Sequence, residues 1–233
     1  NINIHHSWND FIKDDFLLDL DAVEKEICNF NPPASVVLKF LEMDICKVKV
    51  VILGQDPYPQ EGKATGRAFE VGDLINWSDK FRQTSLKNIV RLLYFSYTDE
   101  LLKYNDIRRE IQSGNFKLLP PNKLFIHWES QGVLLLNTSL TVTKGYPGSH
   151  TKLWVSLTDK LIKYICITNK NVKWFLWGKH AQRYRYTIKA IDFYECNHPM
   201  ICSKKNPRDF INCLCFKQTK NVIDWLGETL QCL

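Results

Sequence analysis

The chain has 233 residues, of which 45% are hydrophobic and 24% are charged, and its formal net charge is +6. This composition is typical of a globular protein and excludes the disordered, collagen-like and coiled-coil classes. The length suits one α/β domain with its own core, so we expect residues 1–233 to form a single domain. No apolar run in the sequence approaches the roughly 18 residues of a membrane-spanning helix.

Residues 15–29 carry apolar side chains on one helical stripe and predict an amphipathic helix, which Pro32-Pro33 ends. A second helical stretch is predicted at residues 35–41. Residues 48–53 form a run rich in β-branched side chains and predict a buried strand. Residues 55–66, which contain several prolines and glycines, follow this strand as a loop.

The middle of the chain continues the alternation of helix and strand. A helix is predicted over residues 84–94, with a threonine or serine cap at its start. Residues 114–123 are predicted to be loop, and residues 133–136 form a second buried strand. Glycine and proline mark a further loop at residues 145–148, and the clearest helical pattern covers residues 151–166.

The last third of the chain predicts two more strands. They cover residues 172–177 and 191–194, with a helix at residues 179–188 between them. Residues 197–207 are predicted to be loop, and the C-terminal part is predicted to be helical to about Trp225. Strands that alternate with helices indicate parallel pairing through right-handed crossovers.

Two compositional features bear on the partner and the compartment. The first 30 residues are acidic, whereas positive charge gathers at residues 179–185 and 204–208, a one-sided distribution that favours a nucleic-acid partner. The eight cysteines include no C-x-x-C pair, which disfavours a zinc or iron–sulfur site. Cys28 and Cys166 have apolar neighbours and are expected to be small buried hydrophobes in a reducing cytoplasm.

Polar and aromatic residues follow each of the four predicted strands. These segments are Gln55-Asp56-Pro57-Tyr58, Asn137-Thr138-Ser139, Gly178-Lys179-His180 and Asn197-His198-Pro199. In an open parallel sheet the ligand binds beyond the carboxyl ends of the strands, so these segments meet at one rim. An acid, an amide, an aromatic ring and an imidazole at one rim are the mixture expected of an active site.

Each of these residues also has a simpler interpretation. An aspartate before a proline is by default a turn residue, Asn137 suits a strand-end cap, and His198 suits a solvated loop. Phosphate-binding glycine motifs and a G-x-S-x-G elbow are both missing from the sequence. The prediction of an active site therefore rests on these residues taken together and not on any one of them.

Five motifs in order give a sharper indication. They are VILGQDPYP at residues 51–59, GRAF at 66–69, GVLLLNT at 132–138, LWGKHAQ at 176–182 and His198-Pro199. Together they resemble the uracil-DNA glycosylase family (family 1) from about residue 7 to Trp225. The resemblance implies a three-layer α/β/α sandwich with a central four-stranded parallel sheet and no metal or cofactor. It also implies hydrolysis of the N-glycosidic bond of uracil in DNA, which leaves an abasic site and begins base excision repair.

The resemblance assigns catalytic roles to two residues. Asp56 would stabilise the cationic sugar and position water, and His198, as a neutral imidazole, would donate to O2 of the departing uracil. A backbone N–H at Gln55 would add to this pocket. Hydrolysis also requires the nucleotide to flip out of the duplex, because a stacked base cannot reach such a pocket.

Base recognition is assigned to three further residues by the same resemblance. The side-chain amide of Asn137 would fit the N3–H and O4 of uracil and oppose cytosine, which presents the inverse pattern. Tyr58 would occupy the space of the C5 methyl and so reject thymine, and Phe69 would stack on the base.

The DNA-contacting segments depart from the family pattern. The residues that align with DNA contacts are Ser85, Gly178, Lys179, Ile201, Cys202 and Ser203. The usual serine after the third strand is Lys179, so a charge contact replaces a hydroxyl contact. The leucine that normally wedges into the duplex aligns with Cys202, which is smaller, and Ile201 is the alternative wedge.

Two alternatives remain at this point. One is a non-catalytic DNA-binding module that kept the fold, against which Asp56 and His198 argue. The other is a glycosylase for another base, which Tyr58 and Asn137 disfavour, while the missing cysteine ligands disfavour the iron–sulfur relatives. We expect a monomer that acts on uracil-containing DNA, single- or double-stranded, in the cytoplasm or, in a eukaryotic host, in the nucleus.

Overall fold

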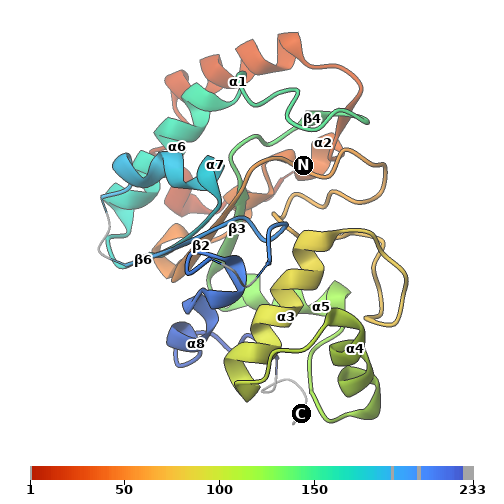
Figure 1. Ribbon diagram of the computed structural model, residues 1–233. Helices are drawn as coiled ribbons and strands as arrows, with labels where there is room; N and C mark the ends of the chain where they lie inside the picture. The colour runs from red at the N-terminus through yellow and green to blue at the C-terminus, as the bar shows by residue number, and fades with distance from the viewer. Residues whose placement is uncertain (1, 190–191, 204–205, 228–233) are drawn as a thin grey trace.

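The computed structural model describes residues 2–189, 192–203 and 206–227, and a four-stranded sheet lies at its centre (Figure 1). Its strands are β2 (Val50–Gly54), β3 (Val133–Asn137), β5 (Lys173–Trp177) and β6 (Phe193–Cys196). They are ordered β3-β2-β5-β6, and every neighbouring pair is parallel, as the sequence predicts. Gly54 pairs with Asn137, so the carboxyl ends of β2 and β3 lie level with each other.

Both faces of the sheet are buried, which explains why its strands are almost continuously apolar. Val50 and Ile52 belong to the core on one face, whereas Val51 and Leu53 belong to the core on the other. Strand β6 is the exception, because it lies at the sheet edge and is only partly covered. The guanidinium of Arg185 stacks on its Phe193 ring, with 3.6 Å between the guanidinium carbon and the ring centroid.

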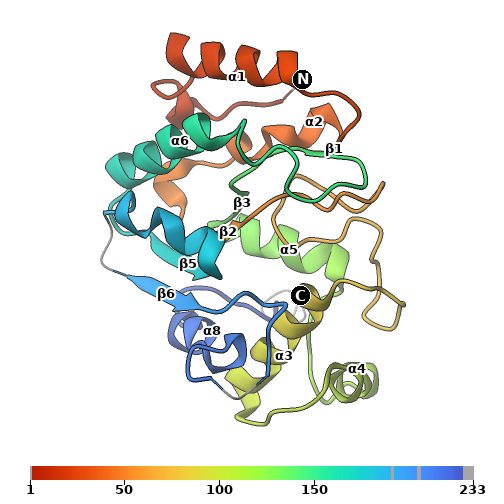
Figure 2. The same ribbon diagram turned by 45° about the horizontal axis from the view of Figure 1, so that its top comes forward.

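Helices cover the two faces and complete three layers (Figures 1 and 2). One face is covered by α3 (Thr84–Thr98), α4 (Tyr104–Ser113), α5 (Pro121–Ser130) and α8 (Cys215–Thr219). The other face is covered by α1 (Asp14–Glu26), α6 (Val155–Thr168) and α7 (Lys179–Gln182). This arrangement confirms the predicted α/β/α sandwich. In the described ranges no helix combines the length and the apolar character that spanning a bilayer would require.

Several helices differ from the predicted ones. α4 was not predicted, and α5 begins inside the segment predicted to be loop at residues 114–123. Pro120-Pro121 resembles a loop signal, but proline is well tolerated in the first turn of a helix, where its missing N–H has no partner to lose. The helix predicted at residues 35–41 is only α2 (Ala34–Val37) followed by a 3₁₀ turn at Lys39–Glu42.

The C-terminal third also shows differences. β6 begins at Phe193, later than predicted, and residue 191 of the predicted strand lies outside the described residues, as do residues 204–205 of the predicted loop. The helix predicted at residues 179–188 is α7 followed by a 3₁₀ turn at Arg183–Tyr186. Beyond residue 206, regular helix is limited to α8 and the 3₁₀ turn Phe210–Asn212 within the described chain.

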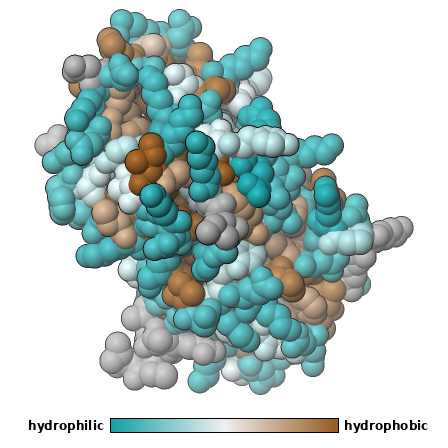
Figure 3. All heavy atoms as spheres, turned by 90° about the vertical axis from the view of Figure 1, so that its left-hand side faces the viewer, coloured by the Kyte–Doolittle hydropathy of each residue, from teal (hydrophilic) through white to brown (hydrophobic). Residues whose placement is uncertain are grey.

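The cysteine prediction is partly wrong. Cys196, Cys213 and Cys215 are buried, but Cys28 is exposed and Cys166 is half-buried. Cys28 follows the end of α1, in the connection to β1, and therefore does not share the inward stripe of that helix. The outer surface is mostly hydrophilic on the face seen in Figure 3, where apolar residues form separate patches.

A second, two-stranded sheet lies next to the carboxyl end of β2. β1 (Phe30–Asn31) pairs antiparallel with β4 (Val142–Thr143), an arrangement the sequence did not predict. The buried Asn31 side chain donates from Nδ2 to the Pro59 carbonyl at 2.9 Å, and the Gly145 N–H donates to the same oxygen at 3.0 Å. These two bonds hold the turn that follows β2.

Candidate active site

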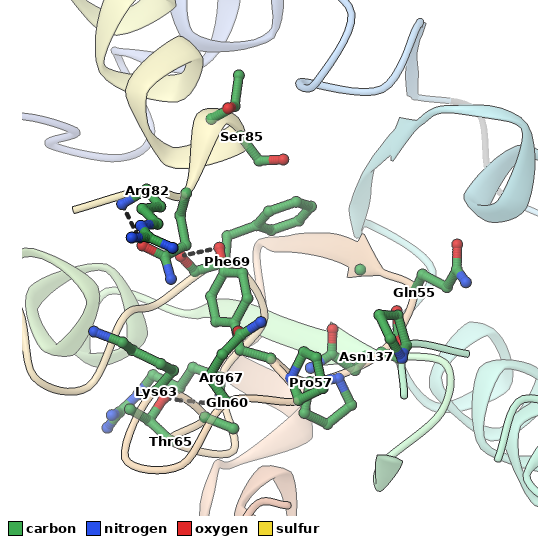
Figure 4. Close-up of a pocket in the computed structure, with 18 of the residues that line it drawn as sticks. Gln55, Pro57, Gln60, Lys63, Thr65, Arg67, Phe69, Arg82, Ser85 and Asn137 are labelled. Atoms are coloured by element: carbon green, nitrogen blue, oxygen red, sulfur yellow. Dashed lines mark hydrogen bonds between the residues drawn. The ribbon is translucent and has the colours of Figure 1, made fainter. Parts of the chain in front are cut away.

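A pocket of about 770 Å³ opens at the carboxyl ends of the central strands. The six residues predicted to act in catalysis or base recognition all line it, namely Gln55, Asp56, Tyr58, Phe69, Asn137 and His198. Figure 4 shows Gln55 and Asn137 on one side of the pocket and Lys63 and Arg82 on the other. The structure thus brings together residues from four separate segments, as the parallel sheet predicts.

Asp56 lies half-buried in the turn after β2. Its Oδ2 accepts a hydrogen bond from the Gly148 N–H at 2.6 Å. Burial raises the pKa of the Asp56 carboxyl, and the Gly148 N–H acts in the opposite direction because it stabilises the charged form. Among the described residues, no hydrogen-bond partner is found for Oδ1. One oxygen is therefore fixed by the backbone, and the other is available to a ligand.

His198 presents a neutral imidazole to the pocket. Its Nδ1 accepts from the Met200 N–H at 3.2 Å, which assigns the ring proton to Nε2. Burial lowers the pKa of His198 below its usual 6.5, which further favours the neutral form. The Ile201 N–H also donates to the His198 carbonyl at 2.8 Å and closes a tight turn over residues 198–201. The imidazole is therefore oriented as a hydrogen-bond donor.

Gly178 packs directly beneath this histidine. A Cβ at residue 178 would lie 2.8 Å from the His198 Cβ, and the glycine has φ +90°, a conformation that favours residues without a side chain. Gly178 is buried, so its packing against His198 explains the glycine at this position. Its role in DNA contact stays a prediction.

Asn137 places its side-chain amide across the end of β2. A Cβ on Gly54, its partner in the sheet, would lie 2.2 Å from the Asn137 Oδ1. The residue is buried, yet in the described part of the chain nothing hydrogen-bonds to its amide. Because the amide lines the pocket with its oxygen and nitrogen both free among the described residues, it can bind a ligand that supplies both a donor and an acceptor.

Two aromatic side chains form the wall of the pocket. Phe69 has φ +66°, an uncommon backbone conformation for a residue with a side chain. Its ring centroid lies 5.4 Å from that of Trp177 and 6.2 Å from that of His198. The Tyr58 hydroxyl reaches the Phe69 carbonyl at 3.5 Å, and burial raises the pKa of Tyr58, which keeps the phenol neutral.

Thr138 and His180, to which the sequence analysis assigned no role, form a supporting pair behind Gln55. The Thr138 hydroxyl donates to the Gln55 carbonyl at 3.0 Å and lies 2.6 Å from the His180 Nε2, which the Arg183 Nη2 also approaches at 3.4 Å. Burial, together with the positive charge of Arg183, lowers the pKa of His180 to about 4. His180 therefore remains neutral, and its position in α7, shortly after the end of β5, was the available sequence signal.

Three of the predicted DNA contacts lie in different environments. Ser85 lies in the first turn of α3, is 9% exposed and lines the pocket, and no partner for its hydroxyl is found within the described ranges. Lys179 is exposed at the start of α7. The Ser203 backbone N–H and hydroxyl both donate to the buried Asp209 carboxylate, each at 2.7 Å, so this serine is engaged within the protein.

The two candidate wedge residues point in different directions. Cys202 is half-buried, packs against the core and accepts a contact from Arg91 Nη1 at 3.4 Å. Ile201 is 56% exposed, and its neighbour Met200 is 65% exposed. The exposed apolar surface at the tip of this loop is therefore Met200-Ile201.

The outer part of the pocket is cationic. Lys63 pairs with Asp73, and Arg67 pairs with Glu70 and Glu129, so both charges are compensated. A second pair of cations, which the sequence analysis did not single out, consists of Lys80 and Arg82. Both line the pocket and are exposed, and neither has an acidic partner among the residues described.

Comparison with known proteins gives consistent matches. The model of the family described as the uracil DNA glycosylase superfamily matches residues 42–218. The uracil-DNA glycosylase of Bordetella petrii is 35% identical over 195 residues, which cover 78% of this chain and 68% of that protein. The uracil-DNA glycosylase of Fusobacterium nucleatum subsp. nucleatum is 32% identical over 236 residues, which cover 97% of this chain and 93% of that protein. The crystal structure of wild-type UNG from Nitratifractor salsuginis has a TM-score of 0.65 at 21% identity and covers 84% of both chains.

The packing of Gly178 beneath His198 generates a prediction for the isolated protein. In ¹⁵N-histidine NMR we expect His198 to be neutral at pH 7, with its proton on Nε2, and to titrate below 6.5 because burial disfavours the imidazolium. Gly178→Ala should shift both the resonances and the titration, because the added methyl displaces the ring.

Gly114→Ala is the matched control. Gly114 also has a left-handed backbone, with φ +80°, but a Cβ there would meet nothing within 4 Å. Both variants therefore introduce backbone strain, and only one touches His198. An equal effect of both substitutions on the His198 signals, or titration at or above 6.5 in the parent protein, would contradict the prediction.

Proposed function

We propose how this chain, which belongs to the uracil-DNA glycosylase superfamily, uses its pocket to hydrolyse the N-glycosidic bond of uracil in DNA. The enzyme is a DNA repair hydrolase that leaves an abasic site and so begins base excision repair. The observation that supports the assignment of roles is the convergence of a carboxylate, an unpartnered amide and a neutral imidazole in one pocket. These groups are Asp56, Asn137 and His198.

The reaction separates charge, and the pocket offers one group for each charge. Cleavage of the bond develops an oxocarbenium-like sugar and a uracil anion, by analogy with other glycoside hydrolyses. Asp56 stabilises the cationic sugar, and its Oδ1 orients the attacking water while Oδ2 stays on the Gly148 N–H. His198 donates its Nε2–H to O2 of the departing uracil, as a donor in an oxyanion hole does.

Base selection follows from the donors and acceptors around the ring. The Asn137 amide accepts from uracil N3–H and donates to O4, whereas cytosine presents the inverse pattern at both positions. Gly54 permits this placement because it has no Cβ to displace the amide. Tyr58 fills the space that the C5 methyl of thymine would need, and Phe69 stacks on the base.

The loop that carries His198 supplies the wedge. A nucleotide that flips out leaves a gap in the stack, and an apolar side chain in that gap offsets part of the unstacking cost. Ile201, with Met200 beside it, has the exposure that insertion needs. Cys202 faces the core and Arg91, so we assign the wedge to Ile201.

The DNA backbone is bound by groups at the rim. Lys80 and Arg82 line the outer pocket without acidic partners in the described chain, and Ser85 adds a hydroxyl at the N-terminal turn of α3. The exposed Lys179 extends this positive surface beyond the pocket. The proposal also includes action as a monomer, in the cytoplasm or in the nucleus of a eukaryotic host.

The role of Asp56 predicts a selective loss of turnover. Asp56→Asn keeps an oxygen for the Gly148 N–H but removes the charge that stabilises only the transition state. In single-turnover assays on a uracil-containing oligonucleotide with EDTA present, we expect a loss of about a hundredfold or more, with DNA affinity within about threefold of the parent.

Asp106→Asn provides a matched control, because Asp106 forms an exposed ion pair with Arg109 on α4. It should cleave at the parental rate. If Asp56→Asn instead cleaved within about threefold of the parental rate, this carboxylate would not have the role assigned to it, since a loss of about a hundredfold is expected for such a group.

The assignment of the wedge predicts a difference between substrates. Ile201→Ala should slow cleavage of duplex DNA by about tenfold, equivalent to about 1.4 kcal/mol of lost stabilisation, and should leave single-stranded DNA nearly unaffected. Parallel rate measurements on the two substrates test this. Cys202→Ala is the comparison variant, and a selective loss on duplex DNA in that variant instead of Ile201→Ala would reverse the assignment.

The cationic rim predicts salt dependence. The logarithm of the affinity for duplex DNA should fall linearly with the logarithm of salt concentration, by about 0.9 per neutralised phosphate. Lys80→Ala combined with Arg82→Ala should make this slope shallower by about one to two units. Lys170→Ala serves as the control, because Lys170 is exposed in the turn before the amino end of β5, whereas the pocket lies at the carboxyl ends of the strands. An unchanged slope in the double variant would place these cations away from the backbone.

A further inference from the structure

The loop that carries His198 is fastened to α3 by one buried side chain. Asn88 is 6% exposed, and its Nδ2 donates to the Pro199 carbonyl at 2.6 Å across 111 residues of sequence. We propose that Asn88, oriented by Arg91, is a positioning residue that sets the place and the tautomer of the His198 imidazole. This inference rests on the proposed function, because it concerns the donor that acts on the leaving base.

The mechanism follows from the planarity of one peptide unit. The Pro199 carbonyl and the Met200 N–H belong to the same peptide, whose atoms lie nearly in a plane. Asn88 holds the carbonyl end of this unit, while the N–H end donates to the His198 Nδ1 at 3.2 Å. A shift of the carbonyl therefore turns the N–H away from Nδ1, and the ring loses the contact that keeps its proton on Nε2.

Arg91 determines which way the Asn88 amide faces. Its Nη1 donates to the Asn88 Oδ1 at 2.9 Å, and its Nε donates to the Leu102 carbonyl at 3.0 Å. With its oxygen engaged by a cation, Asn88 directs its NH₂ group to Pro199. The reverse orientation would place two oxygens together and an NH₂ group against the guanidinium. The hydrogen bonds thus run in one direction, from Arg91 through Asn88 and the peptide to His198, and each polarises the next.

Other contacts in the described chain hold the residues before His198 and those after Ile201, but not the peptide between Pro199 and Met200. The Cys196 carbonyl accepts from the Gly178 N–H at 2.8 Å and from Gln182 Nε2 at 2.7 Å, and the Asn197 N–H donates to the Arg208 carbonyl at 2.7 Å. Apart from His198 itself, Asn88 is the one side chain among the described residues that bonds to the peptide after Pro199. The position of that peptide therefore depends on α3.

The test uses Asn88→Leu, which has a similar volume but no donor. On single-stranded uracil-containing DNA we expect kcat to fall by about tenfold to a hundredfold, because a small displacement of a catalytic group has a cost of this size. KM should stay within about threefold, because the base-recognition residues are untouched. Arg91→Met should cause a smaller loss in the same direction, and it provides the test if Asn88→Leu does not fold.

Ser96→Ala is the matched control. Ser96 is also buried in α3, but its hydroxyl bonds to the Leu92 carbonyl within the same helix. Loss of that bond should reduce stability without changing kcat. In ¹⁵N-histidine NMR, Asn88→Leu should shift the Nδ1 and Nε2 signals of His198, and Ser96→Ala should not.

A double-mutant cycle separates positioning from general stability. In a His198→Gln background, adding Asn88→Leu should lower kcat by less than about a further twofold, because the effect of Asn88 passes through the imidazole. Fully multiplicative losses, or parental kcat in both Asn88→Leu and Arg91→Met, would overturn the inference. Parental activity of His198→Gln alone would instead remove the role assigned to His198 under the proposed function, so the two failures are distinguishable.

Discussion

The pairing of Gly54 with Asn137 at the level carboxyl ends of β2 and β3 is the constraint on which the pocket depends. A single added carbon at Gly54 would lie 2.2 Å from the Asn137 Oδ1, so the strand end and the amide leave no space between them. The amide can therefore read a base only because the neighbouring strand ends without a side chain. The turn that begins at Gln55 then brings Asp56 to the same rim.

Functional groups in this pocket lie on loops, but hydrogen bonds tie those loops to regular elements. The Gly148 N–H fixes Asp56, the Thr138 hydroxyl fixes the Gln55 backbone, and Asn88 fixes the peptide after His198. Donors and acceptors that are already oriented need little reorganisation when charge develops on the substrate. The functional residues thus lie on loops, and hydrogen bonds to the helices and the sheet fix their positions.

The sequence predicts the parts of this protein that depend on local patterns and sheet topology. Apolar strands end at polar residues, so Asp56, Asn137 and His198 could be located before their geometry was known. Contacts between distant segments left no such pattern, and the bond from Asn88 to Pro199 is an example. α5 was missed because Pro121 carries the same signal at the start of a helix as in a loop, and only tertiary packing decides between the two.

The turn over residues 198–201 has a mechanical consequence. Because the Ile201 N–H is bonded to the His198 carbonyl, the wedge and the catalytic imidazole sit on one short rigid lever. A displacement of Ile201 as it enters the stack would therefore be transmitted through this turn to the imidazole, which couples the position of the donor to the insertion of the wedge.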